Sequence, residues 1–171
     1  MIIITNLKSK YVPLSKMGRR WRLHFGFEPY YEVDKDGNKT ETNLGTWTEI
    51  WLSGKPSIEQ VKGIILNAMN KDIDKKILSG FIWKDMSVWL SIENQFNYKA
   101  AYDLAIMSQG HSLPVTFKFG STNSPVYYTF ESLEDISDFY VSAMTYISTY
   151  LTEGWKKKDS IDWTVYEKAL E

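Results

Sequence analysis

The spacing of apolar residues first changes near residue 54, and this change limits the folds that the chain can adopt. Before it, Trp21, Leu23, Phe25 and Phe27 occupy every second position, which is typical of a strand with one buried face. After it, apolar residues recur every three or four positions, as in amphipathic helices. The pattern therefore predicts a β-rich segment followed by a segment that contains helices.

Residues 1–54 are predicted to form a small antiparallel β meander. Residues 34–38, with the sequence Asp-Lys-Asp-Gly-Asn, are a strong turn signal, and residues 46–52 follow as the returning strand. The turn superficially resembles a calcium loop, but its glycine comes too early and no glutamate stands at the required distance. We therefore expect a solvated hairpin turn there and no metal site.

Residues 55–171 are predicted to alternate helices with two β hairpins. Ser57 and Gln60 form a capping box for a first helix that runs to Gly80, and a break at residues 70–72 is left open. The other expected elements are hairpins at residues 81–90 and 113–130 (its turn at 120–125), a helix from Ser91 to Gly110, a helix from Ser132 to Gly154, and a short helix within 159–171. The fold class is α+β with mostly antiparallel pairing, and the chain divides into domains 1–54 and 55–171.

The helix expected after Ser91 is rich in aromatic rings and amides. Ile92, Phe96 and Ala100 share one of its faces, and Leu104 and Met107 continue that face. The amides lie elsewhere, where they would either fix the backbone ends of the neighbouring hairpins or meet a partner. We expect the internal bracing, because buried amides need hydrogen-bond partners and nearby turns supply them.

Composition argues against several classes of function. The chain has 20 basic and 21 acidic side chains, so it lacks the positive surplus that nucleic-acid binding needs. Basic runs at residues 18–22 and 155–158 are explained by a strand edge and a helix C-terminus. The absence of cysteine excludes disulfides and thiolate zinc sites, and no apolar run approaches the ~20 residues of a membrane span. We expect no nucleic acid, membrane, small molecule or cofactor as a partner.

The titratable residues do not form a catalytic pattern. His24 is expected to face outward from a strand and His111 to lie in a loop, each without a visible orienting carboxylate. Glu131, Glu134, Asp135 and Asp138 are explained by their position at a helix start. We therefore expect no catalytic, cofactor-binding or metal-binding residues, and we expect that the protein is not an enzyme.

Aromatic residues are numerous, with seven Trp and eleven Tyr in 171 residues. Such rings are enriched both in cores and at interfaces, so the sequence leaves an aromatic core and an assembly surface open as alternatives. The residues proposed for an interface are Trp21, Tyr30, Tyr31, Trp47, Trp51 and Trp155.

Five short motifs occur in a fixed order within residues 70–162, about half of the chain: ILSGF at 77–81, VWLS at 88–91, ENQFN at 93–97, LPVTFKFG at 113–120 and VYYTF at 126–130. Together they resemble domain of unknown function 4376, a family that recurs in phage tail-fibre and tail-assembly proteins, with similar chains in phages and prophages of gut Bacteroidales. The resemblance implies a virion or assembly role and brings no catalytic residues. Residues 1–54 are outside it and would be a docking module.

The sequence therefore favours a structural phage protein of the tail, tail-fibre attachment or collar region. It would act by protein–protein contact in a symmetric assembly, as a homo-oligomer with other virion proteins, and would be assembled in the cytoplasm of the host bacterium. Two alternatives remain: a fibre-assembly chaperone that is absent from the mature particle, or a carbohydrate-binding module that stacks sugars on exposed rings, with Trp21, Trp47, Trp51 and Trp83 as the candidates.

Overall fold

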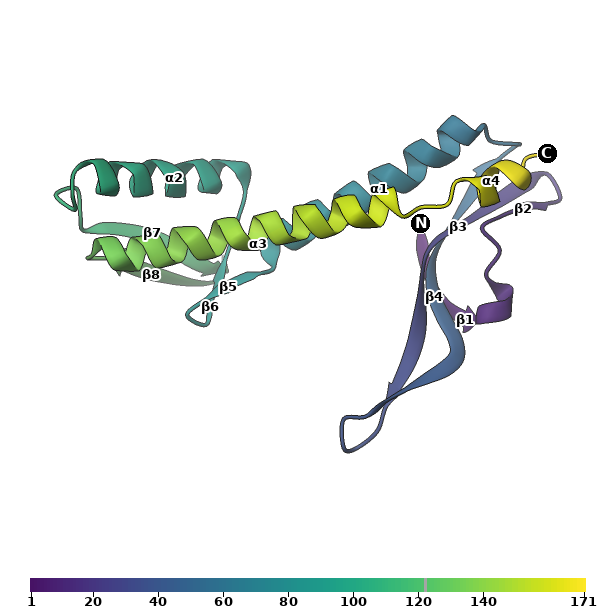
Figure 1. The fold of residues 1–171 in the computed structure, drawn as a ribbon, viewed down its shortest axis with the longest axis horizontal. Helices are drawn as coiled ribbons and strands as arrows, with labels where there is room; N and C mark the ends of the chain where they lie inside the picture. The colour runs from purple at the N-terminus through teal and green to yellow at the C-terminus, as the bar shows by residue number, and fades with distance from the viewer. Residues whose placement is uncertain (122) are drawn as a thin grey trace. The chain divides into compact units, whose positions relative to one another are not determined.

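The computed structural model describes residues 1–121 and 123–171 and has the α+β fold that the sequence predicted (Figure 1). It contains two compact units, residues 1–67 with 161–171 and residues 68–160. The expected division after residue 54 differs from this, because the first turns of a long helix and the C-terminal residues belong to the first unit. There the Lys62 ammonium lies 3.5 Å from the Glu167 carboxylate and 5.7 Å from the centre of the Trp163 ring.

The first unit contains a four-stranded antiparallel sheet in the order β1-β4-β3-β2. Its strands are β1 (Ile2–Leu7), β2 (Leu14–Met17), β3 (Arg20–Val33) and β4 (Lys39–Ser53), with a short 3-10 turn at Lys8–Lys10. Strands β2, β3 and β4 form the expected meander. Strand β1 pairs with the far side of β4, so the first strand lies beside the last one.

The predicted turn at residues 34–38 joins β3 to β4. One oxygen of the Asp34 carboxylate accepts hydrogen bonds from the backbone N–H groups of Asp36 and Asn38, both at 2.9 Å, and the other accepts from the Asn38 amide at 3.0 Å. Gly37 takes the positive φ of 84°. The Asp34 side chain therefore closes the turn itself, as an Asx turn does.

Strand β3 changes its face at a bulge. Phe25 pairs with Thr48 and Glu28 with Thr46, so that Gly26 and Phe27 oppose one residue of β4. Gly26 has φ of 66°, which a glycine adopts without strain. The bulge moves Phe27 off the face of Leu23 and Phe25, and its ring lies over Gly45, where a Cβ would stand 2.3 Å from the ring. The alternation predicted from the sequence therefore fails at Phe27.

The helices and hairpins follow in the expected order: α1 (Ile58–Ser79), β5 (Phe81–Trp83), β6 (Met86–Val88), α2 (Ile92–Met107), β7 (Val115–Ser121), β8 (Ser124–Phe130), α3 (Leu133–Asp159) and α4 (Thr164–Lys168). Helix α1 is continuous through residues 70–72, and Ser57 and Gln60 form the predicted capping box. Ser91 and Ser132 cap α2 and α3 as expected. Part of the predicted turn at 120–125 is Thr122, which lies outside the described residues.

Helix α3 does not end at Gly154, as the sequence predicted, but continues to Asp159. Gly154 is buried, and a Cβ on it would stand 2.2 Å from the Cδ1 atom of Ile73 in α1. The glycine therefore permits two helices to approach closely and does not act as a stop signal. The Lys156, Lys157 and Lys158 side chains complete the last turn, where cations suit the helix dipole.

The second unit has an aromatic core with Phe139 of α3 at its centre. The Phe139 ring is fully buried, and its centre lies 5.0–5.3 Å from those of Trp83, Tyr98, Phe119 and Phe130. These rings come from the β5–β6 hairpin, α2 and the β7–β8 hairpin, so Phe139 joins α3 to both hairpins and to α2. The sequence left an aromatic core and an assembly surface open as alternatives, and the rings around Phe139 belong to a core.

Gly63 in α1 and Gly80 just after it are expected to respond oppositely to replacement by alanine. A Cβ on Gly80 would stand 2.2 Å from the Tyr146 hydroxyl and 2.7 Å from the backbone oxygen of Lys76, whereas Gly63 has open space around it. Gly80→Ala is expected to lower the free energy of unfolding by about 1–3 kcal/mol. Gly63→Ala is expected to raise it by up to about 1 kcal/mol, because alanine favours the helix. Urea denaturation of both variants checks this, and equal effects would contradict it.

Candidate functional site

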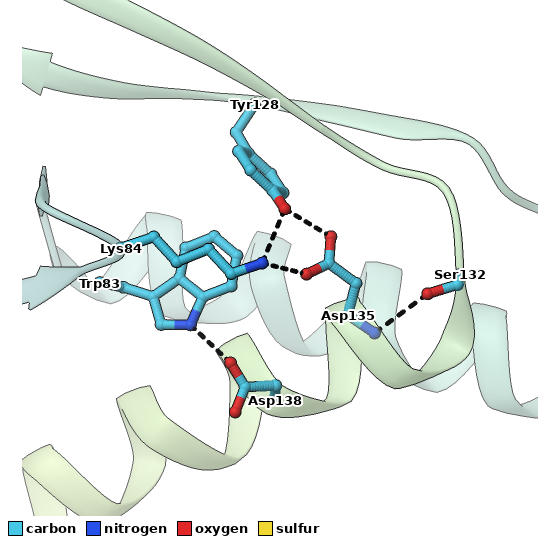
Figure 2. A network of polar contacts seen from close by, with 6 residues as sticks. All are labelled: Trp83, Lys84, Tyr128, Ser132, Asp135 and Asp138. Atoms are coloured by element: carbon cyan, nitrogen blue, oxygen red, sulfur yellow. Dashed lines mark hydrogen bonds and ion pairs between the residues drawn. The ribbon is translucent and has the colours of Figure 1, made fainter.

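The densest polar cluster of the second unit joins the β5–β6 turn to the start of α3 (Figure 2). The Lys84 ammonium lies 2.6 Å from Oδ1 of Asp135 and donates to the Tyr128 hydroxyl at 2.8 Å. The Tyr128 hydroxyl in turn donates to Oδ2 of Asp135 at 2.8 Å. Beside them, the Trp83 indole N–H donates to Asp138 at 2.9 Å.

The backbone places Lys84 there at some conformational cost. Lys84 and Asp85 form a two-residue turn between the paired residues Trp83 and Met86, and both have positive φ, 45° and 61°. Such a turn matches the twist of a hairpin but normally uses asparagine and glycine. Its non-glycine residues are held by the contacts of Lys84, whose ammonium also lies 4.4 Å from the centre of the Trp83 ring.

This cluster suits bracing better than catalysis. The hydrogen bonds to Asp135 and then to Tyr128 raise the pKa of Lys84, which favours the ammonium form that joins these two side chains. Both oxygens of Asp135 accept hydrogen bonds within the cluster. The adjoining hollow of about 320 Å³ is open and is lined by Lys84, Ser132, Glu134, Asp135 and Asp138, without His111.

The strained turn yields a prediction. Asp85→Gly is expected to raise the free energy of unfolding by up to about 1 kcal/mol, because glycine adopts positive φ without the steric cost of a side chain. Ser87→Gly, on the adjacent strand β6, is the control and is expected to lower stability by up to about 1 kcal/mol. Thermal denaturation of both variants measures whether stability rises or falls. A loss of stability in Asp85→Gly would contradict the claim that Asp85 is strained.

A second polar cluster lies in the first unit around His24, which the sequence predicted to face outward. Its side chain is instead only 1% exposed. Its Nε2 atom lies 2.8 Å from Oε2 of Glu49, the residue opposite it on β4, and its Nδ1 atom accepts the backbone N–H of Val12 at 3.3 Å. The correction follows from the rings of Tyr11 and Trp47, which cover this face of the sheet.

The His24–Glu49 pair has the composition of a catalytic dyad but not its accessibility. Both ring nitrogens have hydrogen-bond partners inside the protein, so none faces a substrate. Burial acts to raise the pKa of Glu49, but the hydrogen bonds from His24 and Trp51 and the charge of Arg22 outweigh it and lower the pKa below its ordinary value. The pair therefore holds β3 and β4 together.

The six residues proposed for an interface divide into two groups. Trp21 and Trp47 are buried in the first unit, so they do not form a surface, and the expectation for them is wrong. Tyr30, Tyr31, Trp51 and Trp155 are exposed, as an interface requires, and their role stays a prediction. Trp83 is also buried, so Trp51 is the one exposed ring among the four that the sequence offered for stacking on sugars.

Helix α2 packs on its own unit through one face. Tyr98 and Ala105 are buried, and the Tyr102 ring stacks on Tyr140 of α3 with centres 4.4 Å apart. The amides brace the preceding segment as predicted: Asn94 donates to the backbone oxygen of Trp89 at 2.8 Å, and Gln95 to that of Leu90 at 2.7 Å.

The opposite face of α2 is exposed and mostly apolar, with the charged residues Glu93 and Asp103 among its apolar ones. Ile92 is 87% exposed, Phe96 71%, Leu104 56% and Met107 80%, and the exposed Ala100 lies among them. Their spacing puts them on the side of the helix away from Tyr98 and Ala105. The sequence pattern revealed that these residues share a face but gave no sign that the face points outward. An exposed and mostly apolar helix face is typical of a contact site.

Searches of known protein families, of curated proteins and of solved structures found no match for this chain. The resemblance to domain 4376 therefore stays a prediction. In the part of the chain that the structure describes, no helix is long and apolar enough to span a membrane, and no three acidic or histidine side chains form a group that could hold a metal ion.

Proposed function

We propose that this protein acts by protein–protein contact within a bacteriophage virion, in the tail, tail-fibre attachment or collar region, and that it catalyses no reaction. The observation that carries the proposal is the outer face of α2, where four large apolar side chains are exposed by more than half. Ordered apolar side chains on the outside of a helix are the usual means by which one protein docks on another.

Two further observations support a contact role. The side chains that would be candidates for chemistry, Lys84, Asp135, His24 and Glu49, are occupied by one another and by the backbone. In the first unit, β1 is an edge strand of the sheet, and its residues Ile2 and Ile3 are exposed. Open edges of this kind accept a strand from a neighbouring protein.

The phage setting rests on the motifs between residues 77 and 130 and is tested by the composition of particles. Mass spectrometry of purified virions from the phage or prophage that encodes this chain should detect it at a fixed ratio to the other tail proteins. Detection in the lysate but not in purified virions would favour the fibre-assembly chaperone. Absence from every phage assembly fraction would refute the proposal.

A pair of variants tests the contact itself. Phe96→Glu places a charge within the outer face of α2, and Val141→Glu places one on an exposed apolar residue of α3. We expect particles to lose Phe96→Glu almost completely and to incorporate Val141→Glu at the wild-type ratio, because burial of an unpaired charge at a contact is costly. Equal incorporation of the two variants would refute the role of this face.

A further inference from the structure

We propose that the outer face of α2 binds the same face of a second copy of this chain, with the two helices antiparallel and the two-fold axis at Ala100. This inference rests on the proposed assembly role and names the partner for it. It follows from the order of the side chains along the face, from the charges beside it and from its area.

The order of side chains along the face is nearly the same in both directions. Ala100 lies close to its midpoint, with Phe96 and Leu104 four residues to either side and Ile92 and Met107 at the ends. An antiparallel pair centred on Ala100 places Phe96 against the partner copy's Leu104, and Ile92 against the partner copy's Met107. The small alanine at the axis permits close approach, and the large side chains on either side fill the space.

The charges beside the face are also self-complementary. Lys99 and Asp103 lie on the Ile92 side of the face and pair with each other at 2.6 Å along the helix, and Glu93 lies on the Leu104 side. In an antiparallel pair each flank meets the same flank of the partner, so Lys99 comes opposite the partner copy's Asp103 and Asp103 opposite its Lys99. The Lys99–Asp103 ion pairs of the two copies then join into one network of four charges.

The area of the face is sufficient for a specific contact. The exposed parts of Ile92, Phe96, Leu104 and Met107 amount to roughly 600 Å² in each copy, so complete cover of both faces removes at most about 1,200 Å², the lower end of stable interfaces. A dimer with a dissociation constant on the order of micromolar is expected from an interface of this size.

Sedimentation velocity on the full chain over a range of concentrations measures the pairing. The wild type is expected to pass from monomer to dimer, Phe96→Glu to raise the dissociation constant at least about a hundredfold, and Val141→Glu to leave it unchanged. A wild type that stays monomeric up to about 200 µM, well above the expected dissociation constant, would overturn the proposal. So would equal effects of the two variants.

Charge variants test which residues meet. Lys99→Glu makes the flank wholly acidic and Asp103→Lys makes it wholly basic, so each alone is expected to weaken self-association about tenfold. An equimolar mixture of the two is expected to recover dimers of near wild-type affinity, because the acidic flank then faces the basic one. Failure of the mixture to recover would overturn the antiparallel arrangement.

Single cysteines test the direction of the helices, since the chain has no cysteine of its own. Ala100→Cys is expected to form a disulfide dimer on mild oxidation. Met107→Cys alone is not, because its two copies would stand about 21 Å apart along the pair, beyond disulfide reach. Ile92→Cys mixed with Met107→Cys is expected to cross-link. Efficient cross-linking of Met107→Cys alone would indicate parallel helices and overturn the proposal.

These outcomes separate the dimer from the proposed function. A monomeric chain whose Phe96→Glu variant is lost from virions would mean that the face binds a different virion protein, which refutes the self-pairing and leaves the assembly role intact. A dimer that forms through Ala100 but is absent from all phage assembly fractions would support the self-pairing and refute the virion role.

Discussion

Replacement of Phe139 by alanine is expected to lower the free energy of unfolding of the second unit by about 3–5 kcal/mol. The ring is fully buried and lies among rings from two hairpins and another helix, so its removal leaves a cavity bordered by stiff side chains. Phenylalanine, tyrosine and tryptophan rings cannot fold into a cavity as a flexible methionine can, so little of the lost contact is regained. We expect this to be among the most damaging single substitutions in the chain.

Hydrogen exchange resolved by segment measures the effect of Phe139→Ala, because the chain has two units and a single unfolding transition is not assured. Protection should fall most in β7, β8, α2 and α3. Val141→Ala, an exposed position two residues along the same helix, is the control and should change stability by less than about 0.5 kcal/mol. A loss below about 1 kcal/mol for Phe139→Ala would contradict the central position of this ring.

Glu49→Ala is expected to lower the free energy of unfolding of the first unit by about 3 kcal/mol. It leaves the Nε2 atom of a buried histidine without an acceptor, and it removes the acceptor of the Trp51 indole. Glu49→Gln retains an oxygen that can accept one of these hydrogen bonds, so its cost should be smaller. Glu32→Ala, on the exposed part of β3, serves as the control and should have little effect.

The same carboxylate predicts a dependence on pH. The pKa of Glu49 is lowered in the folded protein, so its contribution to stability is complete above the ordinary value of 4.5 and is lost as the pH falls through the folded pKa. Urea denaturation of the wild type between pH 3 and 7 should therefore show a decline below about pH 4.5 that Glu49→Gln lacks in part. Identical profiles for the two proteins would mean that this pair does not contribute.

Local signals predicted most of the fold. Ser57, Ser91 and Ser132 cap the helices that they were expected to cap, since a cap depends on residues three positions apart. The failures depend on contacts between distant residues. Gly154 resembles a helix stop signal in the sequence, because nothing local shows that Ile73, about 80 residues earlier, packs against it.

The candidate sites were harder to predict for the same reason. His24 meets Glu49 only through the pairing of β3 with β4, and the bulge at Gly26 changes the face of the next ring. The spacing in α2 put Ile92 and Phe96 on one apolar face, but the face that is buried is that of Tyr98 and Ala105. The side that turns inward depends on Tyr140 and Phe117, to which no local pattern points.

The return of residues 161–171 to the first unit has a consequence for the order in which the chain matures. Residues 68–160 are continuous in sequence, whereas the unit that contains β1 lacks α4 until residues 161–171 have also been synthesised. The Tyr166 hydroxyl, which donates to the backbone oxygen of His24 at 3.1 Å, is among its last contacts to form. The unit that contains β1 is therefore completed only after the whole of the other unit has been synthesised.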